Sequence, residues 1–243
     1  MSLLLEDFVI PICCMDESTR KIQRFFGTAF FISPDGIFLS AKHCIPRAVG
    51  DEERLGLIIK SEQKENLFSK ITAYDYAPNN LDIVAGKIDR TTHNRFKFLA
   101  ADLNMWQNVA SLGYPENAII RDEGFWIYMR AHQGYIHRVI EVGKLPLIKN
   151  GGKLIELSFQ VTAGLSGAPL FIPGSSYDSL IGICIGNHAS ERLLDSTNEI
   201  EENGQIYKEI SKRYEYAGIA QDIRDILDWK PSFLSKTIGE ILK

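Results

Sequence analysis

Short apolar runs rich in β-forming residues recur along most of this chain, and each is followed closely by a turn signal. The tetrapeptide SPDG at 33–36 and the tripeptide PNN at 78–80 are two such signals, because proline, asparagine, aspartate and glycine favour tight turns. The runs lie at 8–13, 27–32, 37–41, 55–59, 82–87, 108–113, 125–130, 154–159, 169–172, 180–185 and 216–220. Many short strands with few helical segments predict an all-β fold of the barrel or sandwich class.

Helical patterns come late in the chain. Apolar residues recur at helical spacing over 220–229 and again over 231–243, with Pro231 between the two segments. Before them lies a polar stretch at 187–215 that carries 11 charged residues in 29. Part of that stretch, 205–214, is also predicted to form a helix. We interpret the stretch either as a solvated loop or as a surface that shapes substrate access or docks a regulatory protein.

Charge and cysteine usage exclude several classes of function. The chain has 243 residues with 27 basic and 31 acidic side chains, a net charge of −4, and no basic stripe that would bind nucleic acid. No apolar run approaches the ~20 residues that span a membrane, and the N-terminus lacks the features of a secretory signal. The four cysteines are Cys13, Cys14, Cys44 and Cys184. We expect them to be thiols in a cytoplasmic, reducing compartment, with no metal site and no cofactor.

Three segments carry residue types that fit one mechanism. The hairpin over 27–44 ends at His43, Asp82 begins a strand after the turn at 78–80, and Ser166 lies in a glycine-rich loop before an apolar strand. A serine hydroxyl needs an adjacent base to act as a nucleophile, histidine can serve as that base, and an aspartate can orient the histidine. Gly164 would let the loop turn so that its amide and that of Ser166 bind an oxyanion.

These segments resemble the motifs of the trypsin-like (chymotrypsin-fold) serine peptidases. LSAKHC at 39–44 is similar to the family's histidine motif, LDIV at 81–84 to its aspartate motif, and GLSGAPL at 164–170 to its serine motif. The order histidine, aspartate, serine is also that of the family. The chain looks closer to the bacterial glutamyl-endopeptidase and HtrA-like branch than to the secreted zymogen trypsins.

The resemblance implies roles and an architecture. It assigns His43 as general base, Asp82 as the orienting acid and Ser166 as the nucleophile, with backbone oxyanion donors at Gly164 and Ser166. It also implies two six-stranded antiparallel barrels with the site in the cleft between them. The boundaries that follow are an N-terminal barrel at 1–105 carrying His43 and Asp82, a C-terminal barrel at 106–218 carrying Ser166 and the polar insertion at 187–215, and a helical segment at 219–243.

Two departures from the family pattern bear on activation and redox state. Secreted trypsins pair the cysteine after the catalytic histidine with one fifteen residues before that histidine, and here that position is Thr28. Zymogen-activated members carry an aspartate before the serine, whereas this chain has Leu165, so activation by N-terminal cleavage is not expected. Ala168 replaces the family's second glycine.

The residues expected around a primary substrate pocket are fewer and less specific. The resemblance places Gln160, Ile185, Gly186 and His188 there, and a neutral amide at Gln160 would not favour a basic substrate side chain. His188 could attract an acidic one.

These observations leave three functions to compare. The first is an intracellular serine endopeptidase of narrow or regulated specificity, acting on protein or peptide substrates without a metal or cofactor, and with neither nucleic acid nor membrane as a partner. The second is an inactive module on the same scaffold that binds peptides or partner proteins. The third, an α/β-hydrolase esterase, is disfavoured because Ala168 breaks the G-x-S-x-G motif and the order of the three residues is wrong.

Overall fold

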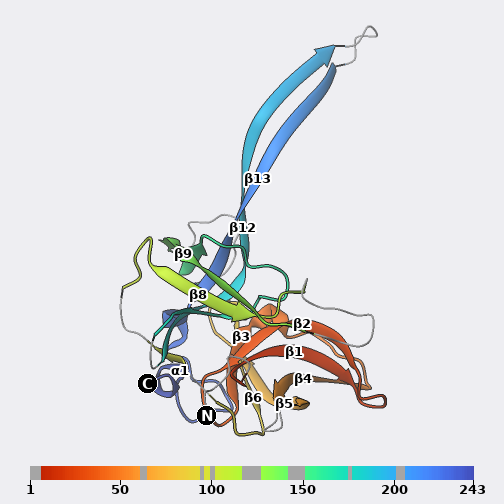
Figure 1. The fold of residues 1–243 in the computed structure, drawn as a ribbon, viewed down its shortest axis with the longest axis vertical. Helices are drawn as coiled ribbons and strands as arrows, with labels where there is room; N and C mark the ends of the chain where they lie inside the picture. Colours follow the sequence, from red (N-terminus) through yellow and green to blue (C-terminus); the bar gives the residue numbers. More distant parts are fainter. Residues whose placement is uncertain are drawn as a thin grey trace.

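The computed structural model describes residues 7–60, 65–93, 96–98, 102–116, 127–141, 151–174, 177–200 and 206–243. The chain folds into two β-barrels that pack against each other, and a long two-stranded arm projects from the second (Figure 1). The prediction of an all-β, two-barrel fold is confirmed. No helix among the described residues is long and apolar enough to cross a membrane.

The first barrel is closed by six antiparallel strands in the order β1-β2-β3-β6-β5-β4. The strands are β1 (Val9–Asp16), β2 (Ile22–Phe31), β3 (Ile37–Ala41), β4 (Glu53–Lys60), β5 (Asn66–Tyr76) and β6 (Ile83–Ile88). The SPDG turn joins β2 to β3, and its Gly36 has a φ of +77°, which glycine adopts without steric cost. A short 3-10 turn, η2 (Lys42–Cys44), follows β3.

The second barrel is a ring of six strands in the order β11-β8-β9-β10-β13-β12, closed by pairing of β11 with β12. The strands are β8 (Asn108–Gly113), β9 (Arg130–Ile140), β10 (Leu154–Leu157), β11 (Pro169–Ile172), β12 (Asp178–Ile200) and β13 (Ile206–Asp222). A further short strand, β7 (Phe96–Phe98), pairs in parallel with β12 on the outside of this ring. Residues 125 and 126 of the expected strand at 125–130 lie outside the described residues, and residues 127–129 form no strand. Only Arg130 of that run belongs to β9, so the rest of β9 was not predicted.

A cluster of aromatic rings joins the two barrels. Phe96 is fully buried, and its ring lies 5.4 Å from that of Phe8, 5.2 Å from that of Phe30 and 5.5 Å from that of Phe171. Phe8 and Phe30 belong to the first barrel and Phe171 to the second. The contacts with Phe8 and Phe30 are edge-to-face and that with Phe171 is tilted. Aromatic contacts of these kinds add to the energy of burial, so this cluster fixes the two barrels against each other.

The polar stretch at 187–215 folds differently from the prediction. Residues 206–214 belong to strand β13 rather than to a helix, and β12 and β13 stay paired out to Ile200 and Ile206 (Figure 1). The helical prediction at 205–214 was therefore wrong. Pairing with β12 gives each of residues 206–214 a cross-strand partner, and tertiary pairing of this kind overrides a weak local helical pattern.

The C-terminal segment is less helical than its spacing indicates. β13 continues to Asp222, a 3-10 turn η4 (Ile223–Ile226) follows, and a single short helix α1 (Ile238–Ile241) lies near the end. Thr237 caps α1 in a capping box with Glu240. The buried side chains of this segment pack on the first barrel's core, so packing rather than helix length stabilises it.

Candidate active site

The turn after β3 brings His43 against Asp82. β3 and β6 are antiparallel neighbours, with Ala41 opposite Ile83, so residues 39 apart in the sequence meet at one end of the strand pair. His43 Nδ1 lies 2.6 Å from Asp82 Oδ2, and the backbone amide of His43 donates to Asp82 Oδ1 at 3.1 Å. The carboxylate thus contacts both the ring and the backbone of His43, which fixes the ring's orientation.

This contact changes the acidity of His43. The hydrogen bond with Asp82, followed by the neighbouring Cys44 side chain, raises the pKa of His43 from 6.5 to about 10. Asp82 is mostly buried, with 18% of its side chain exposed, while 47% of the His43 side chain is exposed. The pair therefore favours an imidazolium at a site that a substrate can reach, which is the form a general base takes after it accepts a proton.

The backbone of Ser166 is held beside this pair by the first barrel. Its carbonyl oxygen accepts a hydrogen bond from the Thr28 amide at 2.8 Å, and Cys44 Sγ lies 3.4 Å from the same oxygen. The next residue, Gly167, has a φ of +85°, and a Cβ there would collide with the Thr28 carbonyl and the Ser40 hydroxyl. The glycine after Ser166 is thus required by close approach of the two barrels.

The backbone carbonyl groups that precede Gly164 and Ser166 both accept hydrogen bonds. Ala163 O accepts from the Glu116 amide at 2.6 Å, and Leu165 O accepts from the Ala168 amide at 3.0 Å. A trans peptide directs its N–H opposite to its C=O, so the amides of Gly164 and Ser166 face away from these anchors. Within the ranges that the structure describes, neither amide donates to a protein acceptor.

The position that faces Cys44 is Gly27, one residue before the position expected from spacing. A Cβ at Gly27 would lie 2.5 Å from Cys44 Sγ and 3.4 Å from Cys44 Cβ, whereas the Thr28 side chain turns toward the loop of Ser166. The assignment of Thr28 to the lost cysteine position was therefore wrong by one residue. All four cysteines are free thiols. Leu165 is fully buried in the core of the second barrel.

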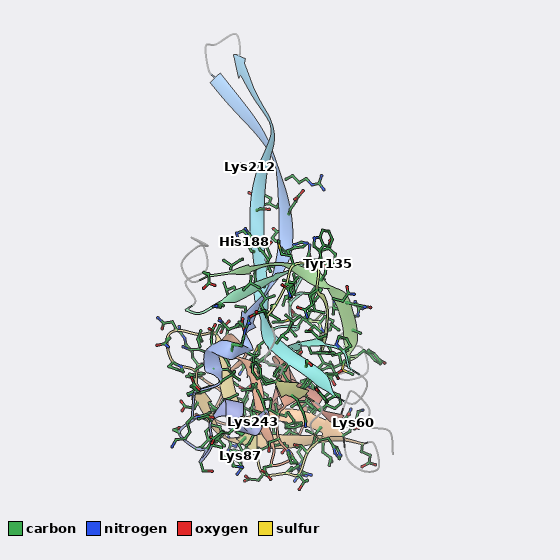
Figure 2. All side chains as sticks on the ribbon, turned by 90° about the vertical axis from the view of Figure 1, so that its left-hand side faces the viewer. Lys60, Lys87, Tyr135, His188, Lys212 and Lys243 are labelled. Atoms are coloured by element: carbon green, nitrogen blue, oxygen red, sulfur yellow. The ribbon has the colours of Figure 1, made fainter. Side chains whose placement is uncertain are left out.

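The four expected pocket residues lie around β12 and the segment before Ser166, but they differ in environment. Gln160 is exposed, while Ile185, Gly186 and His188 are half-buried. His188 lies at the foot of the arm (Figure 2), with its Nδ1 4.0 Å from Glu156 Oε2. Glu156 Oε2 also forms an ion pair with Arg138 Nη2 at 2.8 Å, a contact that motif reasoning did not suggest.

Asn187 and Glu116 are positioning groups that sequence reasoning missed. The side-chain amide of Asn187 makes two hydrogen bonds of 2.8 Å to the backbone of Val161, which ties β12 to the segment before Ser166. Glu116 contributes only its backbone amide. Neither role has a residue-type signature, because both depend on which backbone groups meet in the fold.

Metal-binding side chains do not gather at this site. Over the ranges given above, no three histidine, cysteine, aspartate or glutamate side chains come together as a group that could hold a metal ion.

Two barrels of this topology, with histidine, aspartate and serine at their junction, define the chymotrypsin-type fold. No protein-family model and no curated protein sequence matches the chain. Solved structures do match. The Rv3671c protease from M. tuberculosis in its active form aligns with 91% of this chain and 78% of its own, at a TM-score of 0.56 and 17% identity.

Two further structures support the same conclusion. The inactive form of the Rv3671c protease aligns with 90% of this chain and 85% of its own, at a TM-score of 0.53 and 16% identity. Deg5 aligns with 75% of this chain and 80% of its own, at a TM-score of 0.54 and 17% identity. The chain therefore has the fold of trypsin-like serine proteases of the HtrA and Deg type.

Proposed function

We propose that this protein is a serine endopeptidase that hydrolyses peptide bonds through Ser166, His43 and Asp82. The observation that carries the proposal is the 2.6 Å contact of His43 with Asp82, next to a Ser166 backbone held by Thr28 and Cys44. A histidine oriented by a buried carboxylate and placed beside a serine in a tight loop is the arrangement that activates a hydroxyl.

The geometry supports a specific role for each of the three side chains. Ser166 Oγ attacks the peptide carbonyl while His43 Nε2 accepts its proton, and Asp82 holds the proton on Nδ1 and stabilises the imidazolium. The amides of Gly164 and Ser166 bind the oxyanion. His43 then protonates the leaving amine, and a water molecule activated by the same imidazole hydrolyses the acyl-enzyme. The hydrogen bonds described above support this proposal by holding His43 against Asp82 and the Ser166 backbone against the first barrel.

The primary substrate pocket is proposed to lie between β12 and the segment before Ser166. Ile185 and Gly186 would form one wall and Gln160 part of the other, because the Asn187 amide joins these two segments through Val161. His188 would stand at the edge of the pocket. Glu156 Oε2 already lies 4.0 Å from its Nδ1, so we do not assign a preferred substrate residue to it.

A reducing, cytoplasmic location is part of the proposal. Cys44 lies where a cross-link to β2 would form, but Gly27 faces it, and all four cysteines are thiols. The proposed substrates are proteins or peptides. The arm formed by β12 and β13 is the proposed site for substrate access or for a regulatory protein.

Substitution of the nucleophile tests the proposal. Wild type and Ser166→Ala are incubated with a library of proteome-derived peptides, and new N-termini are identified by mass spectrometry. We expect cleavage by the wild type and none by the variant, with the same melting temperature for both. Equal cleavage by the two proteins would contradict the assignment of Ser166.

The alternative function is a peptidase-fold module that binds peptides or partner proteins without cleaving them. The half-exposed ring of His43, oriented by Asp82, and the amides of the Ser166 loop favour the active enzyme. A fluorophosphonate probe separates the two, because it reacts covalently with an activated serine and does not react with a merely exposed one.

A further inference from the structure

Thr28 is fully buried at the junction of the two barrels, and every polar atom it carries reaches a different part of the active-site region. Its hydroxyl donates to the Gly164 carbonyl at 2.8 Å and accepts from the Tyr114 amide at 3.0 Å. Its backbone amide donates to the Ser166 carbonyl at 2.8 Å, and its own carbonyl accepts from the Ser40 hydroxyl at 2.6 Å.

These bonds fix the loop that contains the proposed oxyanion donors. With the Gly164 carbonyl held by Thr28 and the Ala163 carbonyl held by Glu116, the two peptides that flank Gly164 are both anchored outside the loop. Gly164 has a φ of +87°, a conformation in which a single glycine could rotate either peptide easily. The Glu116 bond fixes the peptide that carries the Gly164 amide, and the Thr28 bond fixes the next peptide from outside the loop, so together they limit rotation about Gly164.

The residue before the nucleophile contributes no ionic constraint. Leu165 is fully buried in the apolar core of the second barrel, so its side chain anchors the loop by packing alone. Its backbone bonds, to the Thr162 carbonyl at 2.9 Å and from the Ala168 amide at 3.0 Å, stay within the loop. Packing is non-directional and does not set the rotation of a neighbouring peptide, whereas a hydrogen bond to the Gly164 carbonyl does. The Thr28 hydroxyl supplies that directional constraint from β2.

We infer that Thr28 is a positioning residue, whose hydroxyl holds the oxyanion loop in its working conformation. This inference rests on the proposed function. Thr28 does not touch the reacting atoms, so it acts on the rate through Gly164. Valine has nearly the shape of threonine but its side chain neither donates nor accepts, so Thr28→Val would remove the bond to the Gly164 carbonyl and the bond from the Tyr114 amide.

The chain offers a matched control in Thr92. It is buried, with 7% exposed, and its hydroxyl donates to the Ser33 carbonyl at 2.8 Å, far from the Ser166 loop in sequence and on the turn of the first barrel. Thr92→Val removes one buried hydroxyl hydrogen bond of the same 2.8 Å length as the bond from Thr28 to Gly164, so it controls for loss of a buried threonine hydroxyl away from the site. Thr28→Ser keeps the hydroxyl and loses only a methyl group.

The experiment measures the rate and the end-point of fluorophosphonate labelling, together with the melting temperature, for wild type, Thr28→Val, Thr28→Ser and Thr92→Val. We expect Thr28→Val to react at least roughly tenfold more slowly than the wild type, because losing one oxyanion donor costs on the order of 10²–10³ in rate. It should still label to the same end-point. Thr28→Ser and Thr92→Val should react at a rate close to that of the wild type.

The outcomes are distinguishable. Absence of labelling in the wild type would contradict the proposed function itself. Labelling of the wild type with an unchanged rate in Thr28→Val, or an equal rate loss in Thr92→Val, would overturn only the role of Thr28. Thr28→Ala replaces the valine variant if the latter does not fold. Failure of both to fold, while Thr92→Val folds, would also overturn the inference, since the hydroxyl would then be required for folding rather than for positioning.

Discussion

A cysteine introduced at Gly27 should form a disulfide with Cys44. The Cβ of residue 27 would lie 3.4 Å from Cys44 Cβ and 2.5 Å from Cys44 Sγ, which is close to the Cβ separation of about 3.5–4.5 Å in disulfides. The bond would close a loop from residue 27 to residue 44, and a loop of about 18 residues gives roughly 3 kcal/mol of stabilisation. For a chain of this size that corresponds to a rise in Tm of about 6–12 °C between the reduced and the oxidised variant.

Thermal unfolding of Gly27→Cys with and without reductant measures this difference. Thiol titration after denaturation should count the four native cysteines and the introduced one in the reduced variant, and two fewer in the oxidised variant. The reduced variant should be less stable than the wild type, because the new side chain also approaches the Ser166 carbonyl within 2.8 Å. Thr28→Cys is the control, since that side chain faces Gly164. A cross-link in Thr28→Cys and none in Gly27→Cys would refute the placement of these two residues.

Three further predictions concern the site, the junction and the arm. Asp82→Asn should move the rising limb of the pH profile of the labelling rate to lower pH, because the carboxylate raises the pKa of His43. The same substitution should slow labelling by on the order of 10⁴. In the wild type, the contribution of His43 to the free energy of unfolding should be present below pH 6.5 and be lost as pH rises toward 10. Phe96→Ala should cost about 3–5 kcal/mol in urea unfolding, and a loss below about 1 kcal/mol would contradict its place at the junction. Replacing 190–212 with a short turn should leave the labelling rate and Tm unchanged but alter the peptides that are cleaved; unchanged cleavage and partner binding would argue against a role for the arm.

The first-barrel hairpin and the shortest strands could be predicted from the sequence. The bounds expected at 37–41, 108–113 and 169–172 coincide with β3, β8 and β11, because each run is apolar, brief and ended by a turn. β5 was missed. Its residues are mostly half-buried or exposed, so its apolar signal is weak and its pairing with β4 and β6 decides the structure.

The arm formed by β12 and β13 shows more clearly that a local sequence pattern does not reveal strand pairing. Residues 205–214 have an apolar spacing that suits a helix, yet 206–214 pair along β12. The spacing of one segment contains no information on whether a partner strand lies beside it. Only the fold supplies that partner, since β12 and β13 leave the barrel as neighbours.

At the site, motif reasoning identified the side chains and missed what holds them. The residue types and their order pointed to His43, Asp82 and Ser166, and the structure brings the first two into contact. The anchors of the loop are backbone amides and the Thr28 hydroxyl, which have no recognisable spacing. Counting back from His43 also placed Thr28 where Gly27 lies, because a count cannot register a difference of one residue in a turn.

Mapping of the phosphonylated residue tests the central claim most directly. Wild type, Ser166→Ala and His43→Ala are treated with a fluorophosphonate, digested and sequenced by mass spectrometry. The account predicts one adduct per chain in the wild type, carried by Ser166, and no adduct in either variant. An adduct on another residue, or full labelling of Ser166 without His43, would contradict it.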